Sequence, residues 1–153
     1  MIKKCLFSIL ILLAVSIIGL VSATFAEVGE SVAQDKNMNA TLRNVIEANF
    51  IAIEKKDIEA EMQTIHTNSP NFYDAREISR QLSPKYNFRC ELLSFKYIAV
   101  DGEYALARGK QKTSRIDGPA FLENITEFIY VFKQEGDLWK LWAQEALDVQ
   151  FMK

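Results

Sequence analysis

The fold is decided by an alternating run of residues, YALARGKQKT at positions 104–113. Small residues take every second position, and larger or charged residues take the positions between them. In an extended strand this alternation places the two sets on opposite faces of a sheet. The sequence therefore predicts a strand whose small side chains lie beneath a covering layer and whose charged side chains reach water.

Three further strands are predicted around this run. The turn residues Asp101-Gly102 join it to an earlier strand at 88–100. Aromatic and β-branched residues at 125–133 indicate a third strand, and residues 138–149 indicate a fourth after a glycine turn. Strands that follow one another in this way predict a mainly antiparallel sheet of four or more strands.

Upstream of residue 88 the apolar residues recur every three or four positions, which indicates helices. The first predicted helix has Asn39 as its N-cap and ends at Lys55-Lys56. A second begins with Asp57 as its cap and has Glu61 in its first turn, where the helix dipole favours an acid. A third begins with Ser69 as its cap and Pro70 at its first position. Three helices before a four-stranded sheet predict an α+β fold with the helices packed on one face.

The face of the sheet away from the helices carries a predicted apolar patch. Its residues are Leu106, Ile129, Val131, Leu138 and Trp142. Monomeric proteins rarely expose a continuous patch of this kind, so we expect a homodimer through this face. The alternative is a one-residue error in register, which would exchange the two faces of the sheet.

The beginning of the chain has the features of a secretory signal peptide. A basic start and an apolar run that ends at Val21 precede small residues up to Ala26. The run is shorter than the roughly 20 residues of a membrane-spanning helix, and an uncleaved anchor is the alternative. We expect a signal peptide at 1–26, a flexible tether at 27–38 and one domain at 39–153. The domain is expected in the periplasm, at the cell surface or outside the cell, with membrane contact only if the leader is not cleaved.

Composition excludes several classes of function. The chain has 18 Lys+Arg against 20 Asp+Glu, so it lacks the basic surface that nucleic-acid binding requires. It has one histidine, and Cys90 is the one cysteine after the leader, so no metal site is expected. No glycine-rich phosphate loop or serine-nucleophile motif occurs, and no cofactor is expected.

Four short segments carry a family resemblance: IEKKDIEA at 53–60, TIHTNSP at 64–70, GPAF at 118–121 and GDLWKL at 136–141. With them the chain resembles the nuclear transport factor 2-like superfamily, which includes SnoaL-like and ketosteroid-isomerase-like proteins. It is most similar to small exported bacterial members of unassigned activity. The resemblance implies a cone-shaped fold, in which a curved sheet wraps the helices around a pocket and its outer face often forms a dimer. Because the superfamily contains isomerases, cyclases and dehydratases as well as carriers and interaction domains, the fold does not choose a function.

Four residues are candidates for the lining of this pocket: His66, Tyr73, Gln111 and Tyr130. A histidine side chain has an unperturbed pKa of about 6.5, which suits a general base, although the ring of His66 also suits the last carbonyls of its helix. Tyr73 is equally consistent with an exposed helical turn, and Gln111 and Tyr130 with hydrogen-bonded core groups. No catalytic residue is assigned.

Two classes of function follow from this pattern. We expect an exported domain that binds a small apolar or amphipathic molecule, or that interacts with another protein. The alternative is an enzyme of the ketosteroid-isomerase or SnoaL type that transfers protons in the same pocket.

Overall fold

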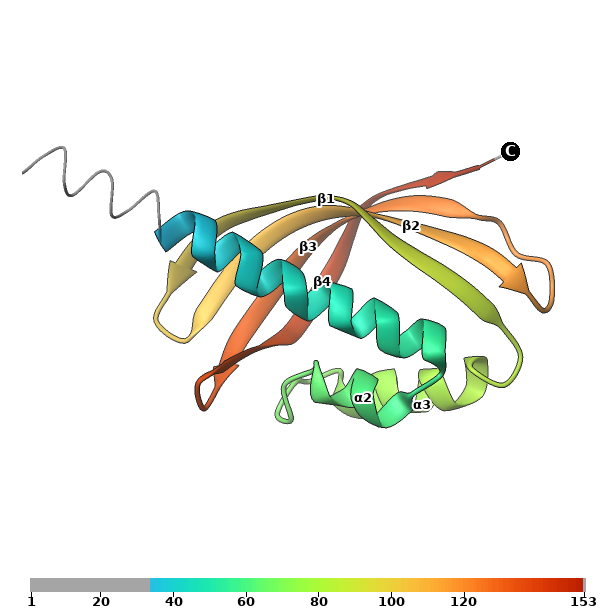
Figure 1. Ribbon diagram of the computed structural model, residues 1–153, viewed down its shortest axis with the longest axis horizontal. Helices are drawn as coiled ribbons and strands as arrows, with labels where there is room; N and C mark the ends of the chain where they lie inside the picture. The colour runs from blue at the N-terminus through green and yellow to red at the C-terminus, as the bar shows by residue number, and fades with distance from the viewer. Residues whose placement is uncertain (1–33, 153) are drawn as a thin grey trace, which may run out of the picture. The chain divides into compact units, whose positions relative to one another are not determined.

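The computed structural model describes residues 34–152 of the chain. One compact unit, Met38–Lys153, contains three helices followed by one sheet (Figure 1). The helices are the long helix at 34–55, α2 (Ile58–Gln63) and α3 (Phe72–Leu82). The strands are β1 (Asn87–Asp101), β2 (Tyr104–Asp117), β3 (Asn124–Glu135) and β4 (Leu138–Phe151).

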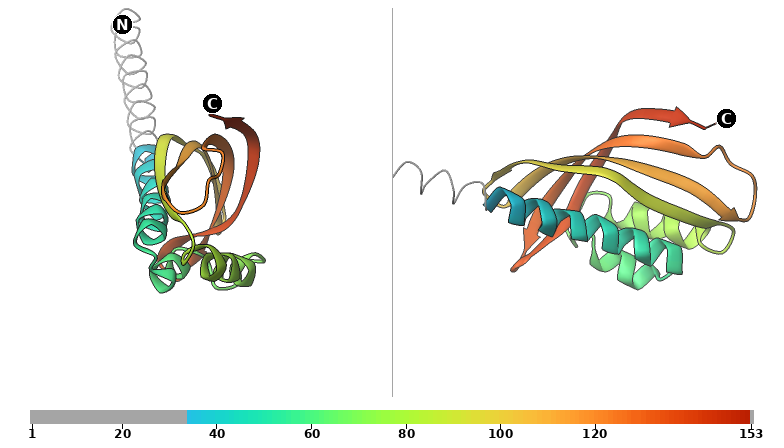
Figure 2. Two further views of the ribbon diagram at one scale, coloured as in Figure 1. Left: turned by 90° about the vertical axis from the view of Figure 1, so that its right-hand side faces the viewer. Right: turned by 45° about the horizontal axis from the view of Figure 1, so that its top comes forward.

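All three helices lie on one side of the sheet, whose strands follow the order β1-β2-β3-β4 with every neighbouring pair antiparallel (Figure 1). β-Bulges interrupt the pairing of β1 with β2 and of β3 with β4, and bulges bend and twist the strands that carry them. The sheet is strongly curved and does not close (Figure 2). These features confirm the predicted α+β class and the cone-shaped fold that the resemblance implied.

The signal peptide expected at 1–26 and most of the tether lie outside the described residues. The end of the tether does not: the long helix already includes residues 34–38. No helix within residues 34–152 is long and apolar enough to cross a membrane.

The predicted N-cap of the long helix is wrong, because Asn39 lies inside the helix. Its side-chain Oδ1 instead accepts a hydrogen bond from the backbone N–H of Tyr97 on β1, at 2.7 Å. Met38 also packs against the core. These tertiary contacts hold the helix in place before the point where its own apolar periodicity begins. Exposed polar residues such as those at 34–37 can extend a helix without adding to that periodicity.

The other helix boundaries depend on local capping. The long helix ends at Lys56, whose φ of 59° lies in the left-handed region, and Asp57 Oδ1 then accepts the N–H of Ala60 at 3.0 Å. This confirms Asp57 as the cap of α2. The predicted start of the third helix is wrong, because α3 begins at Phe72 with Asn71 as an N-cap that makes no side-chain bond.

Ser69 lies two residues before the N-cap of α3 and attaches the α2–α3 connection to the sheet, while its hydroxyl also accepts the backbone N–H of Asn71 at 3.2 Å. Its hydroxyl donates to the carbonyl of Trp142 on β4 at 2.7 Å. The preceding residues pair directly with the same strand: the N–H of His66 donates to the carbonyl of Leu141, and the N–H of Leu141 donates to the carbonyl of Thr64, both at 2.9 Å. Residues 64–66 therefore cover part of the β4 edge.

The core confirms which face of the sheet is covered. Leu42, Ile46 and Phe50 of the long helix pack with Ala105 and Ala107 of β2, together with the buried residues Tyr130, Phe132 and Leu141. The small residues of β2 leave room for the larger side chains. At Gly109 there is no space even for a Cβ, because a Cβ there would lie 2.8 Å from the carbonyl oxygen of Ser94. The small residues at alternate positions of 104–113 are thus the ones over which the larger core side chains and the neighbouring strand pack.

Candidate functional site

A cavity of about 470 Å³ lies between α2, α3 and β4. A second cavity of about 210 Å³ lies between α3, the first half of β1 and the second half of β2. Four residues line both cavities: Ile53, Glu61, Ile78 and Ser79. The two cavities are therefore neighbours that share one wall.

Glu61 is the central polar group of that wall. It is only 7% exposed, and its Oε1 accepts a hydrogen bond from the hydroxyl of Ser79 at 2.7 Å. Burial raises the pKa of the Glu61 carboxyl, and the hydrogen bond from Ser79 opposes this rise. No ion pair within residues 34–152 includes Glu61. It is a buried acid that no protein cation neutralises.

Local structure fixes the position of Glu61 on α2. It follows Ile58 by three residues, so the two side chains share one face of the helix. At the end of the helix the Thr64 hydroxyl donates to the Glu61 backbone carbonyl at 2.7 Å and accepts from Asn49 at 2.8 Å. Sequence reasoning took Glu61 for a first-turn acid that stabilises the helix dipole. The signal that was missed is its place on the apolar stripe.

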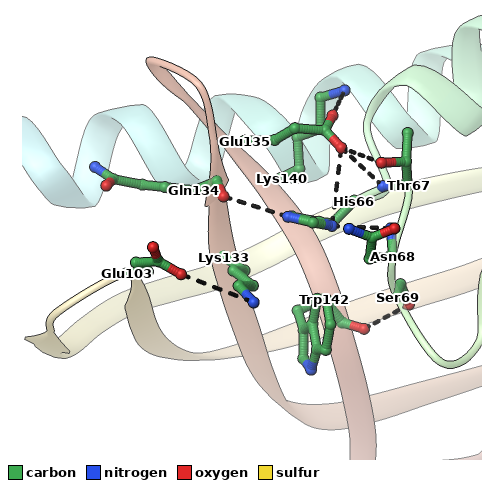
Figure 3. A network of polar contacts seen from close by, with 10 residues as sticks. All are labelled: His66, Thr67, Asn68, Ser69, Glu103, Lys133, Gln134, Glu135, Lys140 and Trp142. Atoms are coloured by element: carbon green, nitrogen blue, oxygen red, sulfur yellow. Dashed lines mark hydrogen bonds and ion pairs between the residues drawn. The ribbon is translucent and has the colours of Figure 1, made fainter.

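The ring of His66 makes polar contacts through both of its nitrogens (Figure 3). His66 lines neither of the two cavities. It is 4% exposed, and its Nδ1 accepts the backbone N–H of Asn68 at 3.0 Å. Its Nε2 lies 3.2 Å from the carbonyl of Gln134 in the β3–β4 hairpin, a geometry in which Nε2 carries the proton and donates. The Trp142 ring packs edge-on at 5.0 Å between centroids. Both ring nitrogens of His66 are therefore used in holding the α2–α3 connection against the β3–β4 hairpin.

Glu135 strengthens the same attachment (Figure 3). Its carboxylate pairs with Lys140 and accepts hydrogen bonds from the hydroxyl and the backbone N–H of Thr67. The bond from Lys140, followed by that from Thr67, lowers the pKa of Glu135 to about 2. This cluster joins the loop after α2 to the hairpin.

The remaining candidates are placed apart from one another. Gln111 lines the smaller cavity, and its amide donates to the hydroxyl of Thr113 at 3.1 Å. Tyr130 is 0% exposed and lies among aromatic rings, and its hydroxyl has no hydrogen-bond partner among the described residues. Burial raises the pKa of Tyr130 above its ordinary value. Tyr73 is 80% exposed on α3. Of the four candidates, only Gln111 lines a cavity with Glu61.

The described residues offer no site for a metal or a reactive thiol. Within residues 34–152 no three His, Cys, Asp or Glu side chains gather closely enough to hold a metal ion. Cys90 lines the smaller cavity, and burial, followed by the nearby charge of Glu54, raises its pKa to about 11. A thiol with this pKa is a weak nucleophile near neutral pH.

The residues predicted for the outer face differ in their exposure. Leu106, 38% exposed, pairs directly with Val131 across the β2–β3 ladder. Leu138 is exposed, and Ile129 and Trp142 are half-buried. The Nζ atom of Lys133 lies 4.6 Å from the centre of the Trp142 ring and covers part of this surface.

Comparison with known proteins identifies both a family match and structural neighbours. The sequence model of the C-terminal domain of the anti-sigma-I factor RsgI9 matches residues 44–152. No curated protein sequence gives a significant match.

Three solved structures illustrate the likeness of fold. A proposed dehydratase of the nuclear transport factor 2-like family from Streptomyces avermitilis has a TM-score of 0.60 and 16% identity, over 72% of this chain and 95% of that one. A proposed aromatic ring hydroxylase from Novosphingobium aromaticivorans has a TM-score of 0.61 and 14% identity, over 78% and 94%. A nuclear transport factor 2-like protein of unknown function from Pseudomonas putida has a TM-score of 0.59 and 13% identity, over 72% and 86%. At these identities the likeness shows a nuclear transport factor 2-like fold and no more.

Proposed function

This chain belongs to the family of the C-terminal domain of the anti-sigma-I factor RsgI9, and we propose that it binds a small apolar or amphipathic molecule outside the cytoplasm. RsgI9 is named as a regulator of a sigma factor. For this chain we propose a regulatory role as well, in which another protein reads whether the small molecule is bound.

The observation that carries this proposal is the cavity between α2, α3 and β4. Its volume of about 470 Å³ lies in the range of roughly 300–1,000 Å³ that is typical of small-molecule sites. Its lining combines seven apolar side chains, Ile65 and Leu141 among them, with seven polar ones, Glu61 and Ser79 among them. A hollow lined by both kinds of side chain can bury the apolar part of a ligand and orient its polar part.

Export and dimerisation belong to the same proposal. The basic start and apolar run of the leader support export. The Leu106–Val131 pair on the outer face supports a homodimer. Leu106→Glu is the sharpest test of the dimer, because Leu106 is already partly exposed and the substitution need not disturb the core. Light scattering should show a dimer for the wild type and a monomer for the variant, and a variant that remains dimeric contradicts this interface.

The binding proposal is tested by native mass spectrometry of the protein purified from its own source. The wild type should retain a non-protein mass. Ala75→Phe fills the larger cavity from α3 and should lose that mass, whereas Tyr73→Ala on the exposed side of the same helix should retain it. An empty protein that is also not stabilised by any member of a small-molecule panel contradicts the proposal, because a ligand of the native state raises its stability.

A second candidate function is proton transfer in the same cavity. It is favoured by Glu61, because burial raises the pKa of this carboxyl and a buried carboxyl with a raised pKa can act as a general acid or base. The test uses the ligand recovered above, incubated with the protein in deuterated water. An enzyme of this kind should exchange a C–H proton of the ligand for deuterium, and Glu61→Gln should abolish the exchange. If the bound ligand shows no exchange of its C–H protons, the proton-transfer function is excluded and the binding function remains.

A further inference from the structure

We propose that the cavity ligand is an organic cation, an amine on an apolar body, whose ammonium group pairs with Glu61. This inference rests on the proposed binding function and names the chemical class of the ligand.

The first argument is the charge of the lining. Two ionisable side chains of one sign, Glu61 and Asp74, line the larger cavity, and no Lys, Arg or His lines it. In the smaller cavity Glu61, Tyr86 and Cys90 are the ionisable groups, again with no basic residue. An anionic ligand would meet only like charge at short range in a medium of low dielectric constant, where repulsion is strong. A cationic ligand meets attraction in both cavities.

The second argument is the state of Glu61 itself. Its Oε1 accepts from Ser79, no hydrogen bond from residues 34–152 reaches its Oε2, and Oε2 keeps some contact with solvent in the cavity. A largely buried carboxylate without a cation is unfavourable, because the remaining water contact replaces only part of the hydration that the charge has lost. A ligand ammonium group carries three N–H donors and one positive charge. It would therefore supply the two things that the Glu61 environment lacks, a donor for Oε2 and a countercharge.

The third argument separates an organic cation from a metal ion. Glu61 and Asp74 are the carboxylates of the larger cavity, and within residues 34–152 no group of three His, Cys, Asp or Glu side chains could hold a metal ion. Ile53, Ile65 and Ile78 contribute apolar surface to the same lining. Such walls suit a cation that brings its own hydrocarbon body.

The experiment compares three probes of the same shape with the full chain: 4-phenylbutylamine, 4-phenylbutanol and 4-phenylbutanoate. Affinities are measured near neutral pH by isothermal titration calorimetry. The amine should bind at least about tenfold more tightly than the alcohol, which corresponds to about 1.4 kcal/mol, and the carboxylate should bind most weakly. Glu61→Gln should abolish the preference for the amine and leave the affinity for the alcohol unchanged. Glu77→Gln is the matched control, because it removes the same charge from an exposed position on α3, outside both linings.

Each outcome decides between the two levels of the proposal. If the alcohol binds as tightly as the amine, or if Glu61→Gln keeps the preference for the amine, the organic-cation inference is overturned and the binding function stands. If none of the three probes binds, the cavity is not a site for molecules of this size and both proposals fail. If Glu61→Gln does not fold by circular dichroism, Ser79→Ala replaces it. That variant frees Oε1 for the ammonium group, so the amine should bind at least as tightly as it binds the wild type, and a tenfold loss overturns the inference.

Discussion

Replacing Tyr130 with phenylalanine removes one oxygen atom from the centre of the core. The Tyr130 side chain is fully buried, and its ring centre lies 6.1 Å from that of Phe95, 5.6 Å from that of Phe128 and 6.3 Å from that of Phe132. Its hydroxyl has no hydrogen-bond partner among residues 34–152. The substitution therefore keeps the ring contacts and removes a polar group that water can no longer reach.

The expected gain in the free energy of unfolding follows from two opposing contributions. A buried hydroxyl without a partner costs about 1–3 kcal/mol. The oxygen also makes a few van der Waals contacts, each of about 0.1–0.2 kcal/mol, which the variant loses. We expect Tyr130→Phe to be more stable than the wild type by about 1 kcal/mol, and to melt at a temperature higher by about 3–6 °C for a domain of this size.

Urea denaturation followed by circular dichroism measures this change, and an unaltered slope would show that both states keep their compactness. Tyr73→Phe is the control, because the Tyr73 hydroxyl is in water and its loss should change stability by less than about 0.5 kcal/mol. A loss of 1 kcal/mol or more in Tyr130→Phe would refute the reasoning. It would show that the hydroxyl has a partner in solution, and Tyr130 would become a ligand-binding residue.

Three further predictions concern packing and titration. Gly109→Ala places a Cβ 2.8 Å from the carbonyl oxygen of Ser94 and should destabilise the protein by about 1–3 kcal/mol in urea denaturation; a change below about 0.5 kcal/mol would show that β1 yields easily. Glu135 has its pKa lowered from 4.5 to about 2, so the stability that it adds is present above pH 4.5 and is lost as pH falls towards 2. The difference in melting temperature between wild type and Glu135→Gln should shrink across that interval, and a constant difference would contradict the pairing. The raised pKa of Glu61 means that the folded chain holds this proton more tightly than the unfolded chain, so stability falls as pH rises through the raised pKa. Melting curves of Glu61→Gln should lack this fall, and an identical pH profile would count against its burial.

The strands and the covered face were predictable because both follow from a period of two. The alternation at 104–113 placed Ala105 and Ala107 on the inner face, and both are buried. The predicted hairpin turns are the observed ones, since Gly102 and Gly136 adopt the positive φ values that these turns require. Local chemistry was sufficient where a residue's role depends on its neighbours along the chain.

The site was not predictable in the same way, because it depends on contacts between distant segments. Glu61 is buried only because α3 covers it and supplies Ser79. In isolation, an acid in the first turn of α2 is fully explained by the helix dipole. Ser69 was assigned to a helix cap, yet its hydroxyl bonds to Trp142, more than seventy residues later in the chain. For His66 the sequence left two interpretations open, a pocket residue or a side chain that bonds the end of its helix. Its ring instead contacts the β3–β4 hairpin, and nothing in the sequence placed that hairpin beside it.

The shallow seating of α3 has a consequence for how a guest molecule reaches the interior. None of its residues is buried, and two side-chain bonds tie it to α2: Ser79 to Glu61 at 2.7 Å and Arg76 to Glu59 at 2.6 Å. An element held by so little apolar contact can swing away by a sub-global opening while the long helix and the sheet stay intact. The amides of α3 should therefore exchange with solvent much faster than those of the long helix. A ligand that bridges Glu61 and the inner side of α3 would slow that exchange. Ligand binding could therefore be detected as increased hydrogen-exchange protection of α3 alone.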